Sequence, residues 1–356
     1  MVQSSPVSEP VNVWDYEALA AARLDPGAHG YYAGGAGDEV TLRDNVEAYR
    51  RWQLRPRVLV DVSGCTTATT VLGHELAMPL VVAPVAFQRV AHPDGEVGMA
   101  RAAASVGTAV CLSTMATATP AEVAATGAMR WFQLYVFRDP GVTRELVAKA
   151  VEAGFTALVL TVDTPVLGRR ERDFRTGFTI PPEIEVASLG RGNLTPREVF
   201  SWVSQAVTWR DIESLTADAG LPVLVKGVQT REDAALACEH GAAGIVVSNH
   251  GGRQLDGVAA TIDVLPEVVE AVASRLPVLV DGGIRRGIDV VKALALGADA
   301  VLAGRAPLWG LAVGGEAGAR HVLELLRDEI LQALKLIGAT SPTDVTRAHI
   351  QRSTAQ

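Results

Sequence analysis

A histidine and an arginine stand close together in the segment Ser248–Gly257, which reads SNHGGRQLDG. The segment follows an apolar run, and two glycines separate His250 from Arg253. Histidine titrates near neutral pH and suits proton abstraction, and arginine binds a carboxylate through two parallel hydrogen bonds. The pattern predicts a site for a substrate whose reacting C–H or O–H lies next to a carboxylate. The alternative is a surface turn that carries both residues incidentally.

Two later segments combine glycine with arginine. Asp281 to Arg285 reads DGGIR, and Gly304 and Arg305 follow another apolar run. Glycine N–H groups at a helix N-terminus bind phosphate in many barrels, and Arg285 and Arg305 could neutralise a dianion. The pattern indicates a phosphorylated ligand but does not distinguish a substrate from a nucleotide or FMN.

Eight short apolar runs are expected to position these residues. Each is followed by a polar turn and a helical pattern, and each is continuously apolar, as expected of parallel strands covered on both faces. Eight such units favour a closed (β/α)8 barrel over two open sheets. The runs are Leu80–Ala86, Thr108–Thr114, Arg130–Val136, Ala157–Asp163, Pro222–Val228, Gly244–His250, Pro277–Gly283 and Ala300–Arg305.

Polar residues stand at the ends of the last six runs, where barrel enzymes place catalysis. A single buried lysine or histidine is more often structural, but polar residues at the ends of six runs together favour an active site. The residues are Gln133, Tyr135, Thr161, Asp163, Lys226, Ser248, Asn249, His250, Asp281, Gly304 and Arg305.

Helix signals lie between the runs. Thr119, Pro120 and Glu122 predict a capping box with proline at the first helical position, and Thr230 and Asp233 predict a weaker one. Glycines that can end a helix in the left-handed conformation precede five of the runs, at Gly107, Gly127, Gly154, Gly241 and Gly297.

Two segments fall outside the repeat. Residues 12–78 precede the first run and predict an N-terminal helical segment, and residues 165–221 form a long connection after the fourth run. Connections of this length are often lids or binding loops, and we expect part of it to be irregular. Residues 1–11 predict a flexible tail, and residues 12–356 a single barrel domain.

Composition excludes several classes of protein. The chain has 356 residues, 48% of them hydrophobic, and a net charge of -8, which argues against a nucleic-acid surface. It contains no apolar run long enough to span a bilayer and no secretory signal. Cys65, Cys111 and Cys238 are far apart, which predicts free thiols in a cytoplasmic protein and no metal site.

Five segments together resemble the FMN-dependent 2-hydroxy-acid oxidase and dehydrogenase family, which includes glycolate, lactate and hydroxymandelate oxidases. The similarity extends from about Tyr16 to Ile350, including a C-terminal tail with Arg347 and His349. In chain order the segments are FQLYVFRD, TVDTPVLGRRERD, LVKGV, SNHGGRQLDG and VDGGIRRG. The resemblance implies FMN as cofactor and an (S)-2-hydroxy acid as substrate.

The resemblance also implies roles for individual residues. His250 would be the catalytic base, Asp163 would orient it, and Lys226 would stabilise negative charge on the reduced flavin. Arg170 and Arg253 would hold the substrate carboxylate, beside Tyr31, Tyr135 and Met115. The cofactor-binding residues would be Val85, Ala86, Ser113, Gln133, Thr161, Lys226, Ser248, Asp281, Gly283, Arg285, Gly304 and Arg305.

Three positions bear on substrate and acceptor. Met115 stands where glycolate oxidases resemble one another in carrying tryptophan, which could leave room for a larger side chain. Val85 replaces a threonine common in the family, and Ala86 stands where several family dehydrogenases carry glycine. The alanine favours an oxidase that uses O2 and gives H2O2. The resemblance further implies a homo-oligomer, a tetramer.

Other interpretations stay open. The chain could be a dehydrogenase or monooxygenase of the same family, a flavin-free barrel lyase or isomerase with Lys226 as a Schiff base, or a non-catalytic flavin- or phosphate-binding barrel. Tyr31 and Tyr135 could simply pack, and Asp163 could cap a helix. Only the resemblance selects Arg170 over Arg169.

Overall fold

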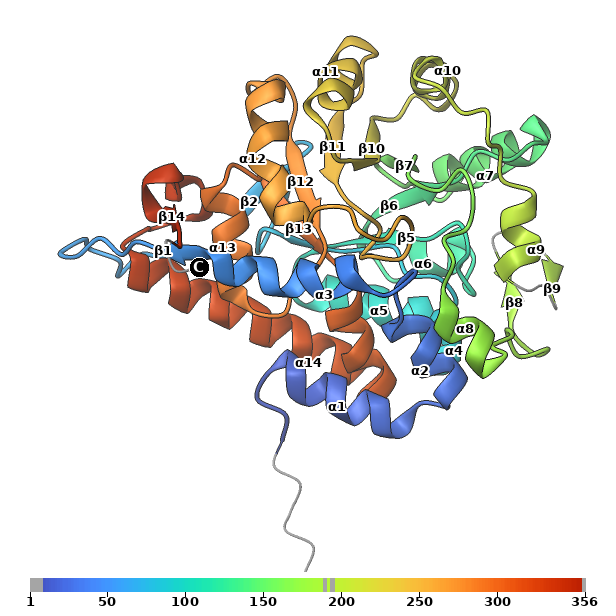
Figure 1. The fold of residues 1–356 in the computed structure, drawn as a ribbon, viewed down its shortest axis with the longest axis horizontal. Coiled ribbons are helices and arrows are strands. Elements are labelled where there is room, and N and C mark those ends of the chain that lie inside the picture. The colour runs from blue at the N-terminus through green and yellow to red at the C-terminus, as the bar shows by residue number, and fades with distance from the viewer. Residues whose placement is uncertain (1–8, 188–190, 193–195, 354–356) are drawn as a thin grey trace, which may run out of the picture.

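Eight parallel strands form a closed barrel in this protein (Figure 1). The structure is a computed structural model that describes residues 9–187, 191–192 and 196–353. The strand order around the barrel is β10-β11-β12-β13-β4-β5-β6-β7. The strands are β4 (Leu80–Val82), β5 (Ala109–Leu112), β6 (Met129–Leu134), β7 (Leu158–Thr161), β10 (Val223–Val228), β11 (Gly244–Val247), β12 (Val278–Asp281) and β13 (Ala300–Ala303).

Helices follow each strand and surround the barrel, which confirms the (β/α)8 prediction. Seven of the eight principal helices reach at least nine residues, and only α6 is a short segment. They are α5 (Gly95–Ser105), α6 (Pro120–Ala124), α7 (Pro140–Glu152), α10 (Arg210–Ala219), α11 (Arg231–Glu239), α12 (Thr261–Val272), α13 (Gly287–Ala295) and α14 (Arg305–Ile337).

The continuous apolar runs reflect burial on both faces of each strand. In β4, Val81 belongs to the cluster inside the barrel, whereas Leu80 and Val82 belong to the cluster that includes the surrounding helices. All three side chains are almost completely buried. Alternate residues thus fill two different apolar environments, so no position in the strand can be polar without a partner.

Most of the predicted strands extend too far at their C-terminal ends. The run Leu80–Ala86 is a strand only to Val82, and Gly244–His250 only to Val247. Several of the polar residues expected at strand ends therefore lie in the loops directly after them. These loops leave the ladder and bend over the barrel mouth, which a pattern of apolar residues does not reveal.

The predicted helix signals are confirmed. Thr119 and Glu122 form a capping box with Pro120 in the first turn of α6, and Thr230 caps α11 by accepting from Asp233 N. The five glycines expected to end helices all have positive φ, between 68° at Gly154 and 103° at Gly297.

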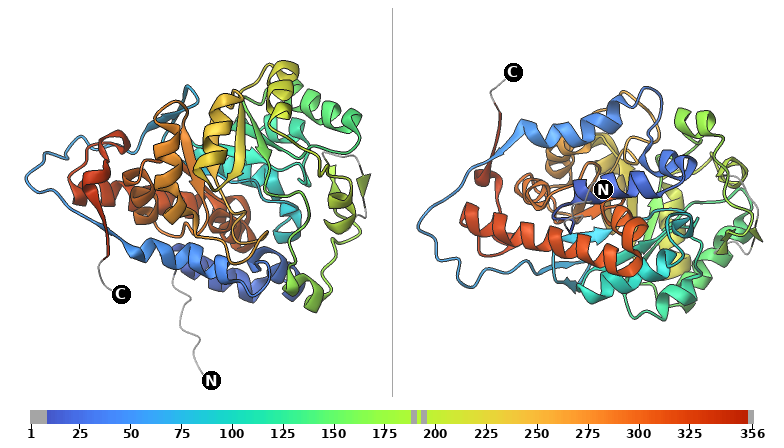
Figure 2. Two further views of the ribbon diagram at one scale, coloured as in Figure 1. Left: turned by 45° about the horizontal axis from the view of Figure 1, so that its top comes forward. Right: turned by 90° about the horizontal axis from the view of Figure 1, so that it is seen from below.

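The N-terminal segment is helical, as predicted, and lies across the barrel and against α14 (Figure 2). Two short strand pairs accompany it. The strand β1 after the N-terminal helices pairs with β14 near the C-terminus, and β2 and β3 form a hairpin. Residues 1–8 of the predicted tail lie outside the described part of the chain. The elements are α1 (Val13–Arg23), α2 (Pro26–Ala33), α3 (Val40–Glu47), a 3-10 turn (Ala48–Arg51), β1 (Trp52–Leu54), β2 (Thr69–Val71), β3 (His74–Leu76) and, at the C-terminal end, β14 (Ile350–Arg352).

The long connection after β7 contains more regular structure than expected. It holds α8 (Glu171–Thr176), the short pair β8 (Glu185–Val186) and β9 (Arg191–Gly192), and α9 (Pro196–Ser201) before α10 begins. In Figure 1 these elements stand at one side of the molecule, and α8 lies next to α2.

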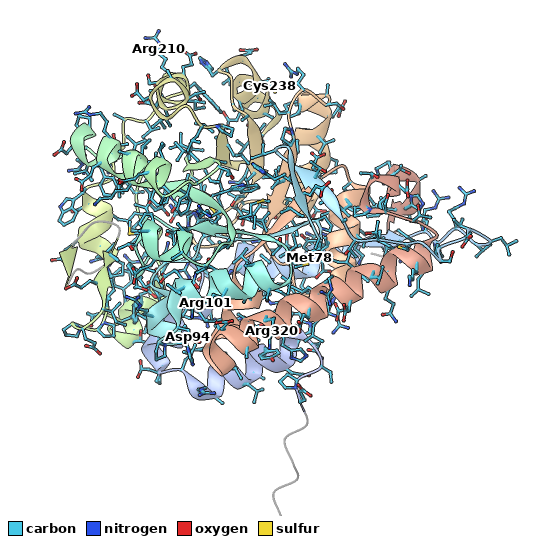
Figure 3. The ribbon with its side chains drawn as sticks, turned by 180° about the vertical axis from the view of Figure 1, so that it is seen from behind. Met78, Asp94, Arg101, Arg210, Cys238 and Arg320 are labelled. Carbon is cyan, nitrogen blue, oxygen red and sulfur yellow. The ribbon has the colours of Figure 1, made fainter. Side chains whose placement is uncertain are left out.

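Helices α5 and α14 lie side by side at the back of the barrel (Figure 3). The carboxylate of Asp94, just before α5, accepts from the backbone N–H of Glu316 at 2.8 Å. Helix α14 bends at Gly315, whose φ is 59°. No described helix is both long and apolar enough to cross a membrane.

Candidate active site

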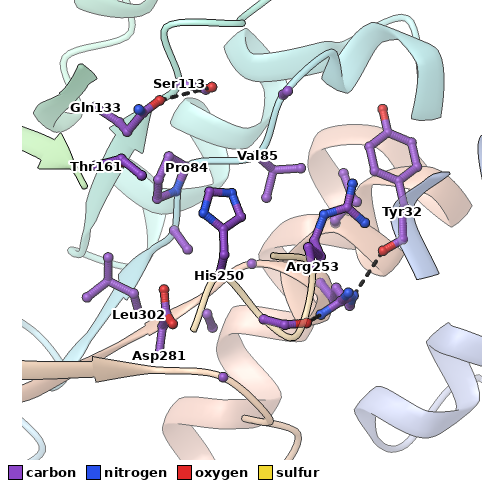
Figure 4. A pocket seen from close by; sticks show the side chains of 18 of the residues that line it. Tyr32, Pro84, Val85, Ser113, Gln133, Thr161, His250, Arg253, Asp281 and Leu302 are labelled. Carbon is purple, nitrogen blue, oxygen red and sulfur yellow. Dashed lines mark hydrogen bonds between the residues drawn. The ribbon is translucent and has the colours of Figure 1, made fainter. Parts of the chain in front are cut away.

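A pocket at the C-terminal ends of the strands gathers most of the predicted site residues (Figure 4). Every predicted substrate-binding residue lines it, and every predicted cofactor-binding residue except Ser248. Those present are Tyr31, Val85, Ala86, Ser113, Met115, Gln133, Tyr135, Thr161, Arg170, Lys226, His250, Arg253, Asp281, Gly283, Arg285, Gly304 and Arg305. Asp163 and Ser248 lie behind this lining.

An unusual turn after β11 carries His250 into the pocket. His250, Gly251 and Gly252 all have left-handed φ values, 58°, 64° and 74°. A side chain on Gly252 would lie 2.6 Å from the backbone of Leu42, so only glycine fits there. A left-handed histidine is uncommon and indicates a functional constraint. The turn brings His250 and Arg253 to the same pocket, as the spacing predicted (Figure 4).

Asp163 holds the His250 ring. Its Oδ1 lies 2.9 Å from Nδ1 of His250, so a proton on Nδ1 leaves the Nε2 lone pair free to accept another. Gly227 allows this approach, because a Cβ there would lie 2.8 Å from that of Asp163. The structure therefore places Asp163 as a partner of His250 and not as a helix cap.

Burial and charge act in opposite directions on this pair. Burial lowers the pKa of His250 below its ordinary value, although Asp163 partly offsets the effect. Burial alone would raise the pKa of Asp163, but the charges of His250 and Lys226 bring it below the usual range. Asp163 is thus ionised and His250 neutral near pH 7, the state that a base requires.

Asp163→Asn should lower activity by about 100-fold, because the imidazole loses the carboxylate that orients it and stabilises its protonated form. The variant should also move the acidic limb of the kcat/KM profile to lower pH, since Asp163 raises the pKa of His250. Steady-state rates between pH 5 and 9 would measure both effects. A limb that moved to higher pH would contradict the pairing.

Lys226 lines the pocket and belongs to a buried polar cluster. Its Nζ lies 3.0 Å from Oδ2 of Asp281 and donates to Oγ of Ser248 at 2.9 Å. Ser248 also accepts from the backbone N–H of His250 at 3.0 Å. Burial would lower the pKa of Lys226, but Asp281 and Asp163 raise it. Ser248 therefore joins the lysine to the histidine turn, a role that its predicted flavin contact did not include.

Three polar atoms in this region have no partner within the described chain. They are Nε2 of Gln133, Oδ1 of Asp281 and Oδ2 of Asp163, all buried. Gln133 itself is held by the backbone N–H of Thr114, which donates to its Oε1 at 3.0 Å. A buried donor and acceptor facing one pocket indicate a ligand that supplies the missing hydrogen bonds.

Two pocket arginines are anchored by the carbonyl end of α2. Nη1 of Arg253 donates to the carbonyls of Tyr31 and Gly34, at 2.5 and 2.9 Å. Arg305 donates to those of Tyr32 and Gly34, at 2.9 and 3.0 Å, and also to Gly251 at 3.0 Å. The two guanidinium groups thus share one acceptor, the Gly34 carbonyl.

Arg170 rather than Arg169 belongs to the site. Arg170 is only 4% exposed, whereas the side chain of Arg169 is 77% exposed. Burial, with the nearby charge of Arg253, lowers the pKa of Arg170 to about 10. A buried cation beside a second, partly buried one favours an anion between them or beside them.

Arg285 lines the pocket but is already partly neutralised. Its Nε donates to Glu17 of α1 at 3.0 Å, and its guanidinium carbon lies 5.5 Å from the centre of the Trp14 ring. Glu17 and Trp14 carried no motif that would have identified them, because their role depends on how α1 packs.

Aromatic side chains form the wall at the mouth. Tyr31 stacks on Phe178 with ring centres 4.7 Å apart, and Tyr135 meets Phe200 of α9 edge to face at 5.3 Å. Phe200 and Tyr32 line the pocket and were missed from the sequence. The long connection therefore does contribute to the site, as expected of a binding loop.

The model of the FMN-dependent dehydrogenase family matches residues 20–352. The chain belongs to this family. It is 50% identical to an L-lactate oxidase of Nostoc sp., covering 95% of this chain and 97% of that one. It is also 50% identical to glycolate oxidase 1 of Zea mays, covering 97% and 96% of the two chains.

Solved structures agree with this membership. A mandelate oxidase crystallised with (S)-4-hydroxymandelic acid superposes with a TM-score of 0.91 at 41% identity, covering 97% of this chain and 99% of that one. Mandelate oxidase with benzoyl-formic acid gives a TM-score of 0.90 at 42% identity over the same shares.

FMN is therefore the cofactor of this chain, and the pocket fits it. The unpaired donor of Gln133 and unpaired acceptor of Asp281 suit a ring system with both kinds of group. Arg285 and Arg305 suit a phosphate dianion, next to backbone turns at Gly283 and Gly304.

Proposed function

We propose that this protein oxidises an (S)-2-hydroxy acid to the 2-oxo acid, with O2 as final electron acceptor and H2O2 as product. The observation that carries the proposal is His250, which lines one pocket with the cations Arg170 and Arg253 and whose Nδ1 lies 2.9 Å from the Asp163 carboxylate behind it. This arrangement offers a base and a carboxylate clamp to one small substrate.

Each residue has a separate task in the proposed reaction. Arg170 and Arg253 bind the substrate carboxylate, and Tyr31 and Tyr135 contact the substrate through their hydroxyls. Nε2 of His250 takes a proton from the substrate, and Asp163 stabilises the imidazolium that forms. FMN supplies a two-electron acceptor for the α carbon.

The chain also supplies a separate set of groups for the cofactor. Lys226, protonated beside Asp281, would compensate the negative charge that the flavin gains when it accepts electrons. Gln133, Thr161, Ser113, Asp281, Val85 and Ala86 would hold the ring and ribityl chain, and Gly283, Arg285, Gly304 and Arg305 would hold the phosphate.

One experiment tests the proposal directly. Anaerobic mixing of the yellow protein with glycolate, lactate, longer 2-hydroxy acids and mandelate should bleach its visible absorption with at least one of them. Admission of O2 should then restore the spectrum with one H2O2 formed per acid oxidised. A flavin that no 2-hydroxy acid reduces would overturn the proposal.

The same experiment decides between the remaining alternatives. A dehydrogenase would be reduced by the acid but reoxidised slowly by O2, and a monooxygenase would release a decarboxylated acid instead of H2O2. A Schiff-base lyase would require a neutral Lys226, whereas the contact with Asp281 raises the pKa of that lysine. The geometry favours the oxidase over the lyase.

Met115 bears on the size of the substrate. Its side chain is 1% exposed and lines the pocket close to Val85. Met115→Trp should cut kcat/KM for mandelate by about 10-fold or more while sparing glycolate, because the larger ring fills space that a bulky substituent needs. Met115→Leu, of similar volume, is the matched control. Equal loss for both acids would show that Met115 does not limit substrate size.

Three further properties belong to the proposal. Residues 12–356 act as one FMN-binding unit, and the chain works in the cytoplasm as a homotetramer. Its three described cysteines are free thiols, which suits a reducing compartment. Light scattering of the purified protein measures its oligomeric state, which the resemblance alone suggests.

A further inference from the structure

A buried carboxylate lies outside the pocket and takes no part in the chemistry described above. Glu96 stands in the first turn of α5 and is 1% exposed. No ion pair with Glu96 occurs among the described residues 9–187, 191–192 and 196–353. Burial raises the pKa of this carboxyl above its ordinary value. Burying a carboxyl group without a cationic partner costs free energy, so its hydrogen bonds must account for its position.

The partners of Glu96 come from two different loops. Oε1 accepts from the backbone N–H of Gln88 and from that of Thr117, both at 3.0 Å, and Oε2 accepts from the Thr117 hydroxyl. Gln88 is the first residue of α4 (Gln88–Ala91), the short helix into which the loop after β4 runs, and Thr117 lies in the loop after β5. One carboxylate therefore joins the two loops.

Both loops reach the pocket within three residues of these hydrogen bonds. Gln88 donates from its side chain to the Val85 carbonyl at 3.3 Å, and Thr117 lies two residues after Met115. The backbone N–H of Phe87 donates to the Met115 carbonyl at 3.0 Å. Phe87 is itself left-handed, with φ of 56°, so the first loop is held in a conformation that its own sequence does not favour.

The N-terminal end of α5, which carries Glu96, is itself held in place by another helix. The first turn of α5 is attached to α14 through the bond from Glu316 N–H to Asp94. Glu96 thus connects a rigid helix pair to the two loops that carry Val85 and Met115 on the pocket wall.

We propose that Glu96 is a positioning residue that sets the separation of the Val85 and Met115 loops and thereby the substrate sizes that the pocket accepts. This inference rests on the proposed function, because it assumes that Val85 and Met115 face flavin and substrate. Glu96 itself touches neither.

The test is a change in selectivity rather than in activity. Glu96→Ala leaves two buried N–H groups without an acceptor, so the loops should move and the ratio of flavin-reduction rates for mandelate and glycolate should change by about 10-fold. Glu96→Gln should restore the ratio, since its amide oxygen can still accept from both N–H groups and its NH2 can face the Thr117 hydroxyl.

The chain offers a matched control. Asp289 is 8% exposed and stands in the first turn of α13, where its Oδ2 accepts from the N–H groups of Arg285 and Arg286 at 3.0 and 2.9 Å. Asp289→Ala removes the same kind of interaction from the phosphate side of the pocket. This variant should lower the melting temperature and weaken FMN binding, which fluorescence titration measures. At saturating FMN it should leave the mandelate-to-glycolate ratio of flavin-reduction rates unchanged.

The possible outcomes distinguish a failure of the positioning role of Glu96 from a failure of the proposed oxidase function. If the unmodified protein reduces its flavin with 2-hydroxy acids but Glu96→Ala keeps the ratio, or Asp289→Ala changes it equally, the positioning role is wrong and the function stands. If no acid reduces the unmodified protein, the function fails first. Should Glu96→Ala not fold, Thr117→Val removes the hydroxyl that donates to Glu96 and accepts from the backbone N–H of Arg89 at 3.3 Å, while both backbone N–H bonds to Glu96 stay. This variant should change the ratio in the same direction, and an unchanged ratio there would overturn the inference.

Discussion

His250→Ala should retain FMN and lose about 1000-fold in the rate of flavin reduction by substrate. His250 is the only histidine among the described residues that line the pocket, and its Nδ1 is paired with a carboxylate. Its removal leaves the arginines and the polar groups that suit the cofactor in place, so binding of both ligands should persist. Anaerobic stopped-flow absorbance measures the loss directly.

A surface histidine provides the control for that variant. His240 also pairs with a carboxylate, Glu213, at 2.7 Å, but on the outside of the barrel. His240→Ala should reduce its flavin at the unmodified rate. If His250→Ala were still reduced at more than about a tenth of the normal rate, a general base of ordinary strength could not be assigned to His250.

Arg253→Lys should weaken substrate binding by roughly 30-fold or more while changing the affinity for FMN little. One nitrogen of Arg253 is fixed on the carbonyls of Tyr31 and Gly34, and the rest of the guanidinium remains available to a carboxylate. A lysine ammonium is a single point and cannot serve both sets of acceptors in the same geometry. The KM for the best acid and the FMN dissociation constant together measure the effect.

Arg169→Lys is the matched control, since that side chain is 77% exposed and its contacts, with Glu171 at 3.9 Å and over the Phe174 ring, lie outside the pocket lining. It should leave both constants unchanged. Equal losses of substrate and flavin affinity in Arg253→Lys would instead indicate that this arginine supports the whole mouth of the barrel rather than the substrate carboxylate.

The barrel could be predicted because its strands are buried on both faces. Leu80 and Val82 pack outward and Val81 inward, so the sequence shows an unbroken apolar run. The ends of the strands were predicted less well, since the residues from Ala83 to Ala86 and at Asp163 leave the ladder while staying largely buried. A buried segment that does not pair as a strand shows the same apolar run in the sequence as a buried strand does.

The site could be predicted where a residue type carries the chemistry. His250, Arg253 and Lys226 stand out as polar groups after apolar runs, and all three line the pocket. Glu17 and Phe200 did not stand out, because a glutamate on a helix and a phenylalanine in a long connection are ordinary in those places. Only the three-dimensional packing brings them to Arg285 and Tyr135.

The shared Gly34 carbonyl has a consequence for how the protein matures. It lies near the start of the chain, whereas Arg253 and Arg305 follow β11 and β13, so the ribosome must release almost the whole polypeptide before these contacts can form. Until then the pocket has no complete set of cations for an anionic vitamin derivative. Capture of FMN should accordingly be a late event in biogenesis, and it selectively stabilises finished molecules.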